Sequence, residues 1–197
     1  MKIIGLSGKL GSGKNYIAEK IIAPYYKDKY NIFIIGFGDQ VKNELYARDL
    51  TLTYDLLYDN KTFESRKKLQ EYATEYGRYK YNNDMWVRGL DMQIETFCKR
   101  SPKEVLIIIC DIRFTNEAEY IKNKNGILFR IESRERTEFR YQKEANNNPD
   151  DYYKISMHIS ETNLDSYNFD YVINNDAQSD DDLLKNINLI LQTYLLI

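Results

Sequence analysis

The sequence has few of the residues that build metal centres, disulfide frameworks or membrane spans: among its 197 residues are 2 cysteines, 1 histidine and 3 prolines. Cys98 and Cys110 have neither metal-site nor redox-pair spacing and lie in apolar segments, so we interpret them as reduced, buried thiols. His158 is better explained as structural, since nothing nearby supplies a second metal ligand. The first residues resemble a strand rather than a signal sequence, and no apolar run approaches the ~18 residues of a membrane span. We therefore expect a cytoplasmic protein that does not bind membranes.

The chain also carries little net charge. The 28 lysines and arginines are balanced by 30 aspartates and glutamates, which leaves a formal charge of −2. This balance argues against a general nucleic-acid-binding protein, although it is compatible with a local basic cleft. The length suits one domain, residues 1–197, with a well-formed core and room for inserted lobes.

The most specific motif lies in the first sixteen residues. An apolar strand, Lys2–Leu6, is followed by Gly8-Lys-Leu-Gly-Ser-Gly-Lys-Asn15 and then by helical apolar spacing up to Ile22. Gly-x4-Gly-Lys is the spacing of a phosphate-binding loop, in which backbone N–H groups surround a phosphate chain and Lys14 reaches the β- and γ-phosphates. A flexible turn is the alternative, but the strand and helix around the motif favour a nucleoside triphosphate site. The residues predicted to bind ATP here are Gly8, Lys9, Gly11, Ser12, Gly13, Lys14, Asn15 and Tyr16.

Strand-like runs alternate with helical patterns along the chain. The runs are Lys2–Leu6, Ile32–Gly36, Val105–Cys110, Ile127–Ile131 and Tyr171–Ile173. This alternation predicts an α/β fold in which a five-stranded parallel sheet is covered by helices on both faces. The uninterrupted apolar run from Val105 makes this segment the best candidate for a central strand. The final helix is expected to begin after Ser179, with acidic residues at its positive end.

Two intervals are too long for simple connections: residues 38–100 and 132–168. Small phosphate-binding-loop kinases place an acceptor-binding lobe and a closing lid in such intervals. A scaffold decorated with immobile helices is the alternative. Within the first interval we expect one helix to end near Gly77 and another to begin at Asp84, and the clearest loop of the chain is Asn146–Asp151.

Asp111 and Arg113 follow the run from Val105. An acid at the carboxyl end of a strand beside the phosphate-binding loop is well placed to hold Mg²⁺, directly or through water. Arg113 would then stabilise charge on the transferred phosphoryl group. A structural Asp–Arg pair that caps the next helix is the alternative.

Further arginines follow the fourth predicted strand. Arg136 and Arg140 are four residues apart, so a helix presents both on one face, and Arg134 precedes them. Such a helix can close on ATP phosphates and exclude water. Interleaved glutamates leave open a solvent-exposed charged helix.

The first long interval carries candidate acceptor ligands. Arg78 is suited to bind an acceptor phosphate with two N–H groups. Trp86 is a candidate for stacking on a base, with Tyr72 and Tyr76 as weaker candidates, because aromatic residues at helical spacing are usually core. Asp39 and Lys42 follow the second predicted strand and are expected to face the same cleft.

Taken together, these segments resemble the deoxynucleoside monophosphate kinases of phages and large DNA viruses, and in part the animal-type phosphomevalonate kinases. The segments that carry the resemblance are Gly8–Lys14, Phe37–Lys42, Leu69–Arg78, Asp84–Trp86, Asp111–Glu117, His158–Glu161, Leu164-Asp165 and Phe169–Asn174. They follow one another across nearly the whole chain. The Thr74–Arg78 and Asp84–Trp86 segments favour the nucleotide branch.

The resemblance implies the fold of a phosphate-binding-loop NTPase, and transfer of the ATP γ-phosphate to a deoxynucleoside 5′-monophosphate. Lys14 would bridge the two phosphates, Arg78 and Arg113 would hold the acceptor phosphate, and arginines 134–140 would close the lid. Asn15 stands where this family often has Asp, so it offers Mg²⁺ only a neutral carbonyl and coordination depends more on Asp111. If the chain is viral, its place is the host cytoplasm.

Three functions stay open on the sequence alone. They are a nucleotide kinase, a phosphomevalonate-type kinase, and a phosphate-binding-loop module that signals without efficient catalysis. The third lacks a guanine-specificity motif. The sequence leaves open the accepted bases and whether the protein is a homodimer.

Overall fold

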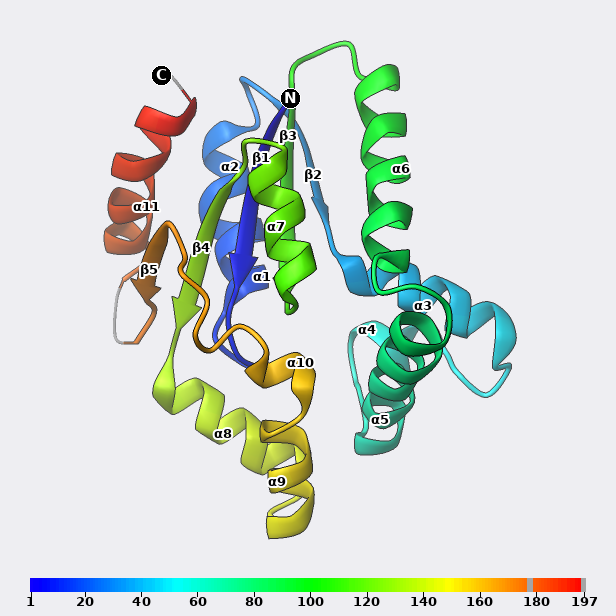
Figure 1. Ribbon diagram of the computed structural model, residues 1–197. Helices are drawn as coiled ribbons and strands as arrows, with labels where there is room; N and C mark the ends of the chain where they lie inside the picture. Colours follow the sequence, from blue (N-terminus) through cyan, green and yellow to red (C-terminus); the bar gives the residue numbers. More distant parts are fainter. Residues whose placement is uncertain (177–178, 196–197) are drawn as a thin grey trace.

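A computed structural model describes residues 1–176 and 179–195. Its sheet contains five parallel strands in the order β2-β3-β1-β4-β5 (Figure 1). The strands are β1 (Lys2–Ser7), β2 (Asn31–Ile35), β3 (Val105–Ile112), β4 (Ile127–Glu132) and β5 (Tyr171–Asn174). The five predicted strands are therefore confirmed. The strand from Val105, predicted as the best candidate for a central strand, lies in the interior of the sheet between β2 and β1, and the middle position belongs to β1.

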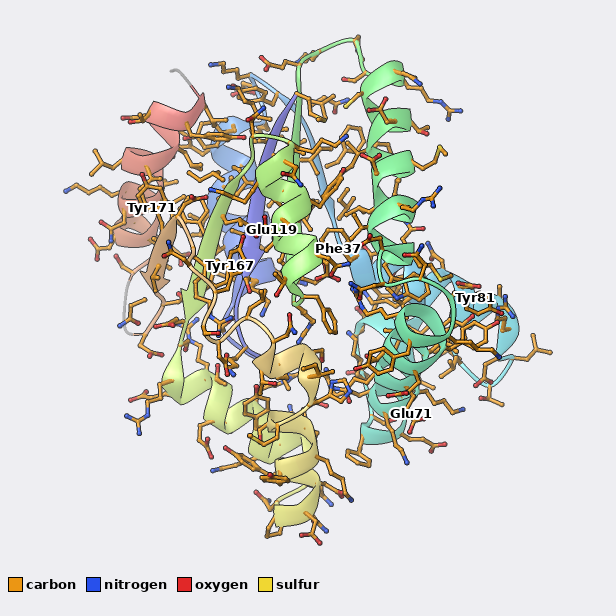
Figure 2. All side chains as sticks on the ribbon, viewed as in Figure 1. Phe37, Glu71, Tyr81, Glu119, Tyr167 and Tyr171 are labelled. Atoms are coloured by element: carbon orange, nitrogen blue, oxygen red, sulfur yellow. The ribbon has the colours of Figure 1, made fainter. Side chains whose placement is uncertain are left out.

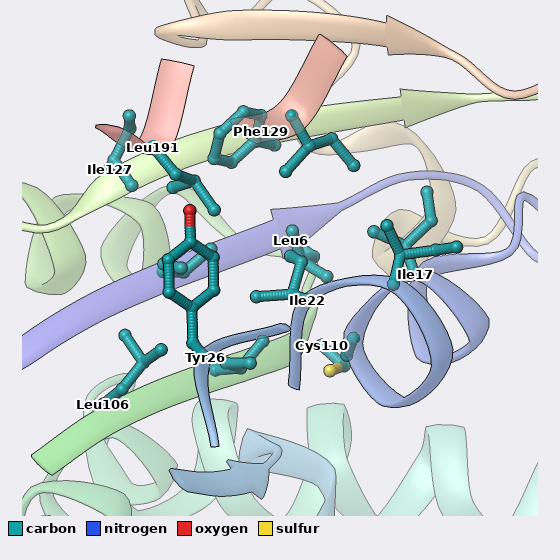
Figure 3. Packing of buried hydrophobic residues seen from close by; sticks show 14 of the residues in the cluster. Leu6, Ile17, Ile22, Tyr26, Leu106, Cys110, Ile127, Phe129 and Leu191 are labelled. Atoms are coloured by element: carbon teal, nitrogen blue, oxygen red, sulfur yellow. The ribbon is translucent and has the colours of Figure 1, made fainter. Parts of the chain in front are cut away.

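Alternate residues of the strands point to opposite faces of the sheet. On β3, Leu106 and Ile108 pack into the core on one face, whereas Ile107 and Ile109 pack into the core on the other. The first core is covered by α1 (Lys14–Tyr16), the π-helical segment η1 (Ile17–Ile22), α2 (Ala23–Tyr26) and α11 (Asp180–Leu195). Figure 3 shows this core, in which Leu191 of α11 and Tyr26 of α2 meet side chains from the strands.

The opposite face of the sheet is covered by three other helices. They are α3 (Phe37–Arg48), α6 (Met85–Arg100) and α7 (Thr115–Asn123). Helices on both faces give the predicted three-layer α/β/α arrangement. The interior strands β1 and β3 are mainly apolar because helices cover them on both sides, whereas β5 at the edge is largely exposed.

Helix α11 begins and ends in specific contacts. Ser179 Oγ accepts a hydrogen bond from the N–H of Asp182 at 3.2 Å, so the predicted cap is confirmed. Near its other end, the Tyr194 hydroxyl accepts from the N–H of Ile3 at 3.2 Å, with the carbonyls of Ile3 and Asn125 each 3.0 Å away as acceptors. The last helix is thus attached to the start of β1.

The two long intervals form two groups of helices that lie beyond the carboxyl ends of the strands, except for α6, which runs back along the face of the sheet (Figure 1). We call residues 38–100 the first insert and residues 132–168 the second insert. The first contains most of α3, then α4 (Tyr54–Tyr58), α5 (Phe63–Glu71), the π-helical segment η2 (Tyr72–Tyr81) and α6; the second contains α8 (Arg134–Glu144), α9 (Pro149–Ser156) and α10 (Ile159–Thr162). Tyr167 ends the second insert with a 2.9 Å hydrogen bond to Glu119 of α7, and both residues are labelled in Figure 2. Within 1–176 and 179–195, every helix is too short or too polar to cross a membrane.

Two boundary predictions were wrong. The helix expected to end near Gly77 continues to Tyr81. Gly77 serves packing instead, because a Cβ there would lie 2.3 Å from the Trp86 ring. The loop expected over Asn146–Asp151 ends early, since the Asn148 side chain accepts from the N–H of Asp150 and α9 begins at Pro149.

Candidate active site

A cavity of about 660 Å³ lies between the phosphate-binding loop and the two inserts. Its walls come from α1, α3, α5, η2, α6 and α8, together with residues that follow β3. Phe37, labelled in Figure 2, lies in its lining where the sheet meets the first insert. The position agrees with the rule that ligands of parallel sheets bind beyond the carboxyl ends of the strands. The volume is within the usual range for small-molecule sites.

The phosphate-binding loop is held by close contacts that require glycine. Gly13 has a φ of 94°, and a Cβ there would lie 2.3 Å from the Asn175 amide nitrogen. That nitrogen donates to the carbonyl of Ser12 at 2.9 Å, so the end of β5 fixes the loop. Gly11 has a φ of 82° and lies against Arg140 of α8, which places the second insert directly on the loop.

Lys14 is folded over this loop. Its Nζ donates to the carbonyls of Gly8 at 2.7 Å and Lys9 at 2.8 Å, and the side chain is buried. Burial, with the charge of Arg113, lowers the pKa of Lys14 to about 7. A phosphate chain at the loop would supply the counter-charge that this amine lacks.

The other predicted loop residues divide into two groups. Gly11, Gly13, Asn15 and Tyr16 line the cavity with Lys14. Gly8, Lys9 and Ser12 lie outside the cavity lining that the structure describes: Ser12 is buried, and Lys9 donates to Asp165 at 2.7 Å. Tyr16 donates its hydroxyl to Asp180 at 2.6 Å.

Arg113 is paired with Glu161 of α10. The Arg113 guanidinium bonds to one carboxylate oxygen, while the other accepts from Tyr141 at 2.7 Å and from the N–H of Leu10 at 2.9 Å. Burial alone would raise the pKa of Glu161, but Arg113, the Tyr141 hydroxyl, Lys14 and the Leu10 N–H lower it to about 2. This carboxylate therefore joins the phosphate-binding loop, β3 and the second insert.

Arg78 is paired with Glu117 of α7. Its guanidinium bonds to Glu117, donates to the carbonyl of Asn83 at 2.9 Å and lies 3.9 Å from the centre of the Phe114 ring. The second oxygen of Glu117 accepts from the N–H of Arg113 at 2.7 Å. Burial outweighs Arg78 and raises the pKa of Glu117 to about 7. The two predicted acceptor arginines are thus connected through one carboxylate.

Asp111 lies at the end of β3 and caps α3. Its two oxygens accept from the N–H groups of Phe37 at 2.8 Å and Gly38 at 2.7 Å, and burial together with the charge of Asp39 raises its pKa. Asp111 and Arg113 therefore have separate partners, and the alternative that they form one capping pair is wrong. Lys42 lines the cavity and bonds to Asp39 at 2.8 Å, whereas Asp39 lies outside the described lining.

The donor set near Asp111 fits a magnesium ion held mainly by phosphates and water. The described residues contain no cluster of three or more His, Cys, Asp or Glu side chains suited to a metal. Mg²⁺ usually needs only one or two carboxylates when phosphates and water complete its shell. Asp111 and the amide of Asn15 both line the cavity and are the available protein ligands.

The three predicted arginines of α8 also differ in whether they line the cavity. Arg136 and Arg140 line the cavity, so the predicted common face is confirmed, whereas Arg134 is exposed and donates its backbone N–H to Asp176. Arg140 pairs with Glu144 at 2.9 Å, and Glu144 also pairs with Arg66 of α5 at 3.0 Å. One carboxylate of the second insert thus holds an arginine from each insert.

In the first insert, Trp86 lines the cavity and donates its indole N–H to the carbonyl of Ala73 at 2.9 Å. Tyr72 and Tyr76 stack on one another with ring centres 4.7 Å apart, outside the described cavity lining. His158 caps α10 through its ring nitrogen, as expected of a structural histidine.

Sequence reasoning missed five charged residues at this site: Glu117, Glu161, Glu144, Arg66 and Lys61. Glu117 and Glu161 lie in segments that carry the family resemblance, which was the available signal. Glu144 and Arg66 are far apart in the sequence and nothing in it pairs them. Lys61 lines the cavity, and burial lowers its pKa to about 8.

Comparison with known proteins shows what the chain is similar to. No family model matches the chain. A curated protein of Acanthamoeba polyphaga mimivirus, named "Putative deoxynucleotide monophosphate kinase", is 28% identical over an alignment that covers 67% of this chain and 74% of that protein. The resemblance indicated by the motifs is thereby confirmed.

Solved structures support the fold. The TT1252 protein of Thermus thermophilus has a TM-score of 0.58 at 14% identity, with 98% of this chain and 97% of that chain covered. A gluconokinase from Sinorhizobium meliloti 1021 has a TM-score of 0.51 at 12% identity, with 99% and 97% covered. The chain therefore has the fold of the P-loop kinases, and among curated proteins it resembles the deoxynucleoside monophosphate kinases.

Proposed function

We propose that this protein transfers the γ-phosphate of ATP to a deoxynucleoside 5′-monophosphate and releases ADP and the deoxynucleoside diphosphate. One observation carries the proposal: a single cavity joins the phosphate-binding loop to an aromatic region of the first insert, with Arg113 and Arg78 in its lining. A donor phosphate chain at the loop and an acceptor phosphate at these arginines would be neighbours. The name of the mimivirus relative supports the same reaction.

Donor binding falls to the loop and the second insert. In this proposal Lys14 leaves the loop carbonyls for the β- and γ-phosphates, and its positive charge stabilises the charge that develops during transfer. Arg136 and Arg140 cover the phosphates from α8, which lies on Gly11, and exclude water that would otherwise hydrolyse ATP. We assign the second insert the role of a lid on this ground.

Acceptor binding falls to the first insert. The acceptor phosphate oxygen attacks the γ-phosphorus in line with departing ADP, and Arg113 and Arg78 hold that acceptor phosphate. Lys42, beside Asp39 at the end of α3 that faces the cavity, adds a further cation. Bound Mg²⁺ would neutralise phosphate charge, with Asp111 and Asn15 as its protein ligands.

A phosphomevalonate-type acceptor is the competing kinase function. The cavity lining favours a nucleotide instead, because it contains three aromatic side chains, Trp86, Phe114 and Tyr58, which suit a base better than a short branched acid. The experiment is a panel of deoxynucleoside monophosphates and mevalonate phosphate, with ATP, Mg²⁺ and ADP release as readout. We expect turnover with at least one deoxynucleotide. Turnover with mevalonate phosphate alone would replace the proposal, and ATP hydrolysis without any acceptor dependence would reject both.

A further inference from the structure

The cavity face of α5 and η2 changes in chemical character along its length. Its lining side chains are Arg66, Leu69, Gln70, Ala73, Thr74 and Arg78. The two charged ends are occupied, since Arg66 pairs with Glu144 and Arg78 pairs with Glu117. Between them lies a stretch without charge, in which Gln70 and Thr74 are the polar members. These two residues are one helical turn apart and therefore share a face.

Neither polar side chain has a partner among the residues that the structure describes. Thr74 is 2% exposed, and its hydroxyl is buried without a hydrogen bond; the Nε of Arg78, one turn further, is in the same state. Gln70, half-buried in the lining, makes no hydrogen bond through its amide within residues 1–176 and 179–195. A buried hydroxyl without a partner is costly, so such a group is normally satisfied by a ligand or by water.

The surroundings of this stretch are flat and apolar. Trp86 lies in the same lining, and its one N–H is already used by the carbonyl of Ala73, so it offers only a ring surface. Val41 and Phe37 of α3 complete the apolar lining on another side. A planar ligand held here would meet aromatic and aliphatic faces, and its edge would meet an amide and a hydroxyl.

We propose that Gln70 and Thr74 read the edge of the acceptor base and so determine which deoxynucleotides are phosphorylated. This rests on the proposed function. An amide presents one donor and one acceptor side by side, which matches the C=O and N–H of thymine or guanine, or, after rotation, the NH₂ and ring nitrogen of cytosine or adenine. The hydroxyl of Thr74 donates or accepts in the same way. Uncharged groups suit this role because bases are neutral, whereas the arginines at both ends suit phosphates.

The test compares kcat/KM for the four deoxynucleoside monophosphates in the wild type and in Gln70→Glu. The glutamate keeps the shape of glutamine but replaces its donor with a second acceptor. It repels the C=O of thymine and still accepts from the NH₂ of cytosine, whereas both purines offer a carboxylate an NH₂ group. We expect the dTMP-to-dCMP ratio of kcat/KM to fall by about 10-fold. KM for ATP should stay within about 2-fold, because the phosphate-binding loop is a separate wall of the cavity.

Three further variants complete the design. Thr74→Val keeps the volume and removes the hydroxyl, and Thr74→Ser restores it; we expect the first to change the base ratios and the second to recover them. Gln192→Glu makes the same chemical change at an exposed position of α11 and should leave all ratios of kcat/KM at the wild-type value. If the wild type phosphorylates none of the four nucleotides, the proposed function itself fails. If it phosphorylates them and Gln70→Glu and Thr74→Val keep the wild-type ratios, only the assignment of base reading is overturned.

Discussion

Two buried arginine–glutamate pairs lie on the cavity, and their carboxylates behave in opposite ways. Glu161, paired with Arg113 beside the phosphate-binding loop, has its pKa lowered to about 2. Glu117, paired with Arg78 beside the first insert, has its pKa raised to about 7. Both side chains are almost fully buried, and each carboxylate also accepts hydrogen bonds from backbone N–H groups. Burial and one arginine therefore do not decide the outcome.

The charges further out make the difference. Glu161 has Lys14 near it in addition to Arg113, and it accepts from the Tyr141 hydroxyl, so its charged form is favoured. Glu117 instead has Asp111 nearby, and that second acid opposes its ionisation. Beside the phosphate-binding loop, Glu161 is therefore an ionised carboxylate with two cations, Arg113 and Lys14, near it. The insert side holds a carboxylate whose charged form is disfavoured by burial and by Asp111.

The largest expected effect tests the donor side. Lys14→Ala should lower kcat by about 10²-fold or more, because it removes a preorganised charge from the transferred phosphate. The loop itself is held by Asn175 and by α8, so the thermal melting curve should change little. ADP release and circular dichroism measure the two quantities. Near-normal turnover would exclude the loop wall from catalysis.

The next effect concerns stability and its dependence on pH. Because the folded-state pKa of Glu161 lies below its unfolded value of 4.5, its contribution is present above pH 4.5 and is lost as the pH falls towards 2. A shift to about 2 corresponds to about 3 kcal/mol. Glu161→Gln should therefore lower the free energy of unfolding by about 3 kcal/mol at pH 7, and by much less at pH 3. Urea denaturation at both values checks this; an equal loss at pH 3 would contradict the charged carboxylate.

The acceptor side is tested by Arg78→Ala. The variant should raise KM for the monophosphate by about 10- to 150-fold, which corresponds to roughly 1.5–3 kcal/mol, while KM for ATP changes little. Arg78→Lys should recover only part of the loss, since an ammonium keeps the charge without the two-pronged geometry. Arg88→Ala, an exposed change on α6, is the matched control. If Arg78→Ala raised KM for ATP and left KM for the monophosphate unchanged, the roles proposed for the phosphate-binding loop and the first insert would be reversed.

The smallest expected effect is a pH dependence of stability opposite in direction to the one expected for Glu161→Gln. The pKa of Glu117 is raised in the folded state, so its contribution to stability is greatest below pH 4.5 and declines as the pH rises to about 7. The stability of Glu117→Gln relative to the wild type should therefore improve across this interval. The same denaturation series measures it. If the stability of Glu117→Gln relative to the wild type instead fell as the pH rose, the pKa of Glu117 would be lowered like that of Glu161, and the two pairs would be alike.

Much of the fold follows from short stretches of sequence. The strand from Val105 is apolar as far as Cys110 because both faces are covered, and Gly-x4-Gly-Lys specifies a backbone shape within seven residues. Arg136 and Arg140 share a face because a helix places them so. These features are local, and for that reason they were predictable.

The pairings at the site are not local. Arg113 and Glu161 are 48 residues apart, and Arg66 and Glu144 are 78 apart. Only the packing of one insert against the other elements selects these partners from the many charged residues available. Gly77 illustrates the same limit: its neighbourhood suggests a helix end, but its actual constraint is the Trp86 ring on another helix.

The position of β1 has a consequence for how the protein is made. This strand precedes the other four in the sequence, yet its two neighbours in the sheet are β3, which begins at Val105, and β4, which begins at Ile127. Its N-terminal end is attached through Ile3 to Tyr194, which lies beyond all five strands in the sequence. Non-local pairing of this kind is slow and leaves strand edges exposed in the meantime. The phosphate-binding loop that follows β1 therefore gains its support only after β3 and β4 have been made, so nucleotide present during translation has no finished site to stabilise until most of the sheet has emerged.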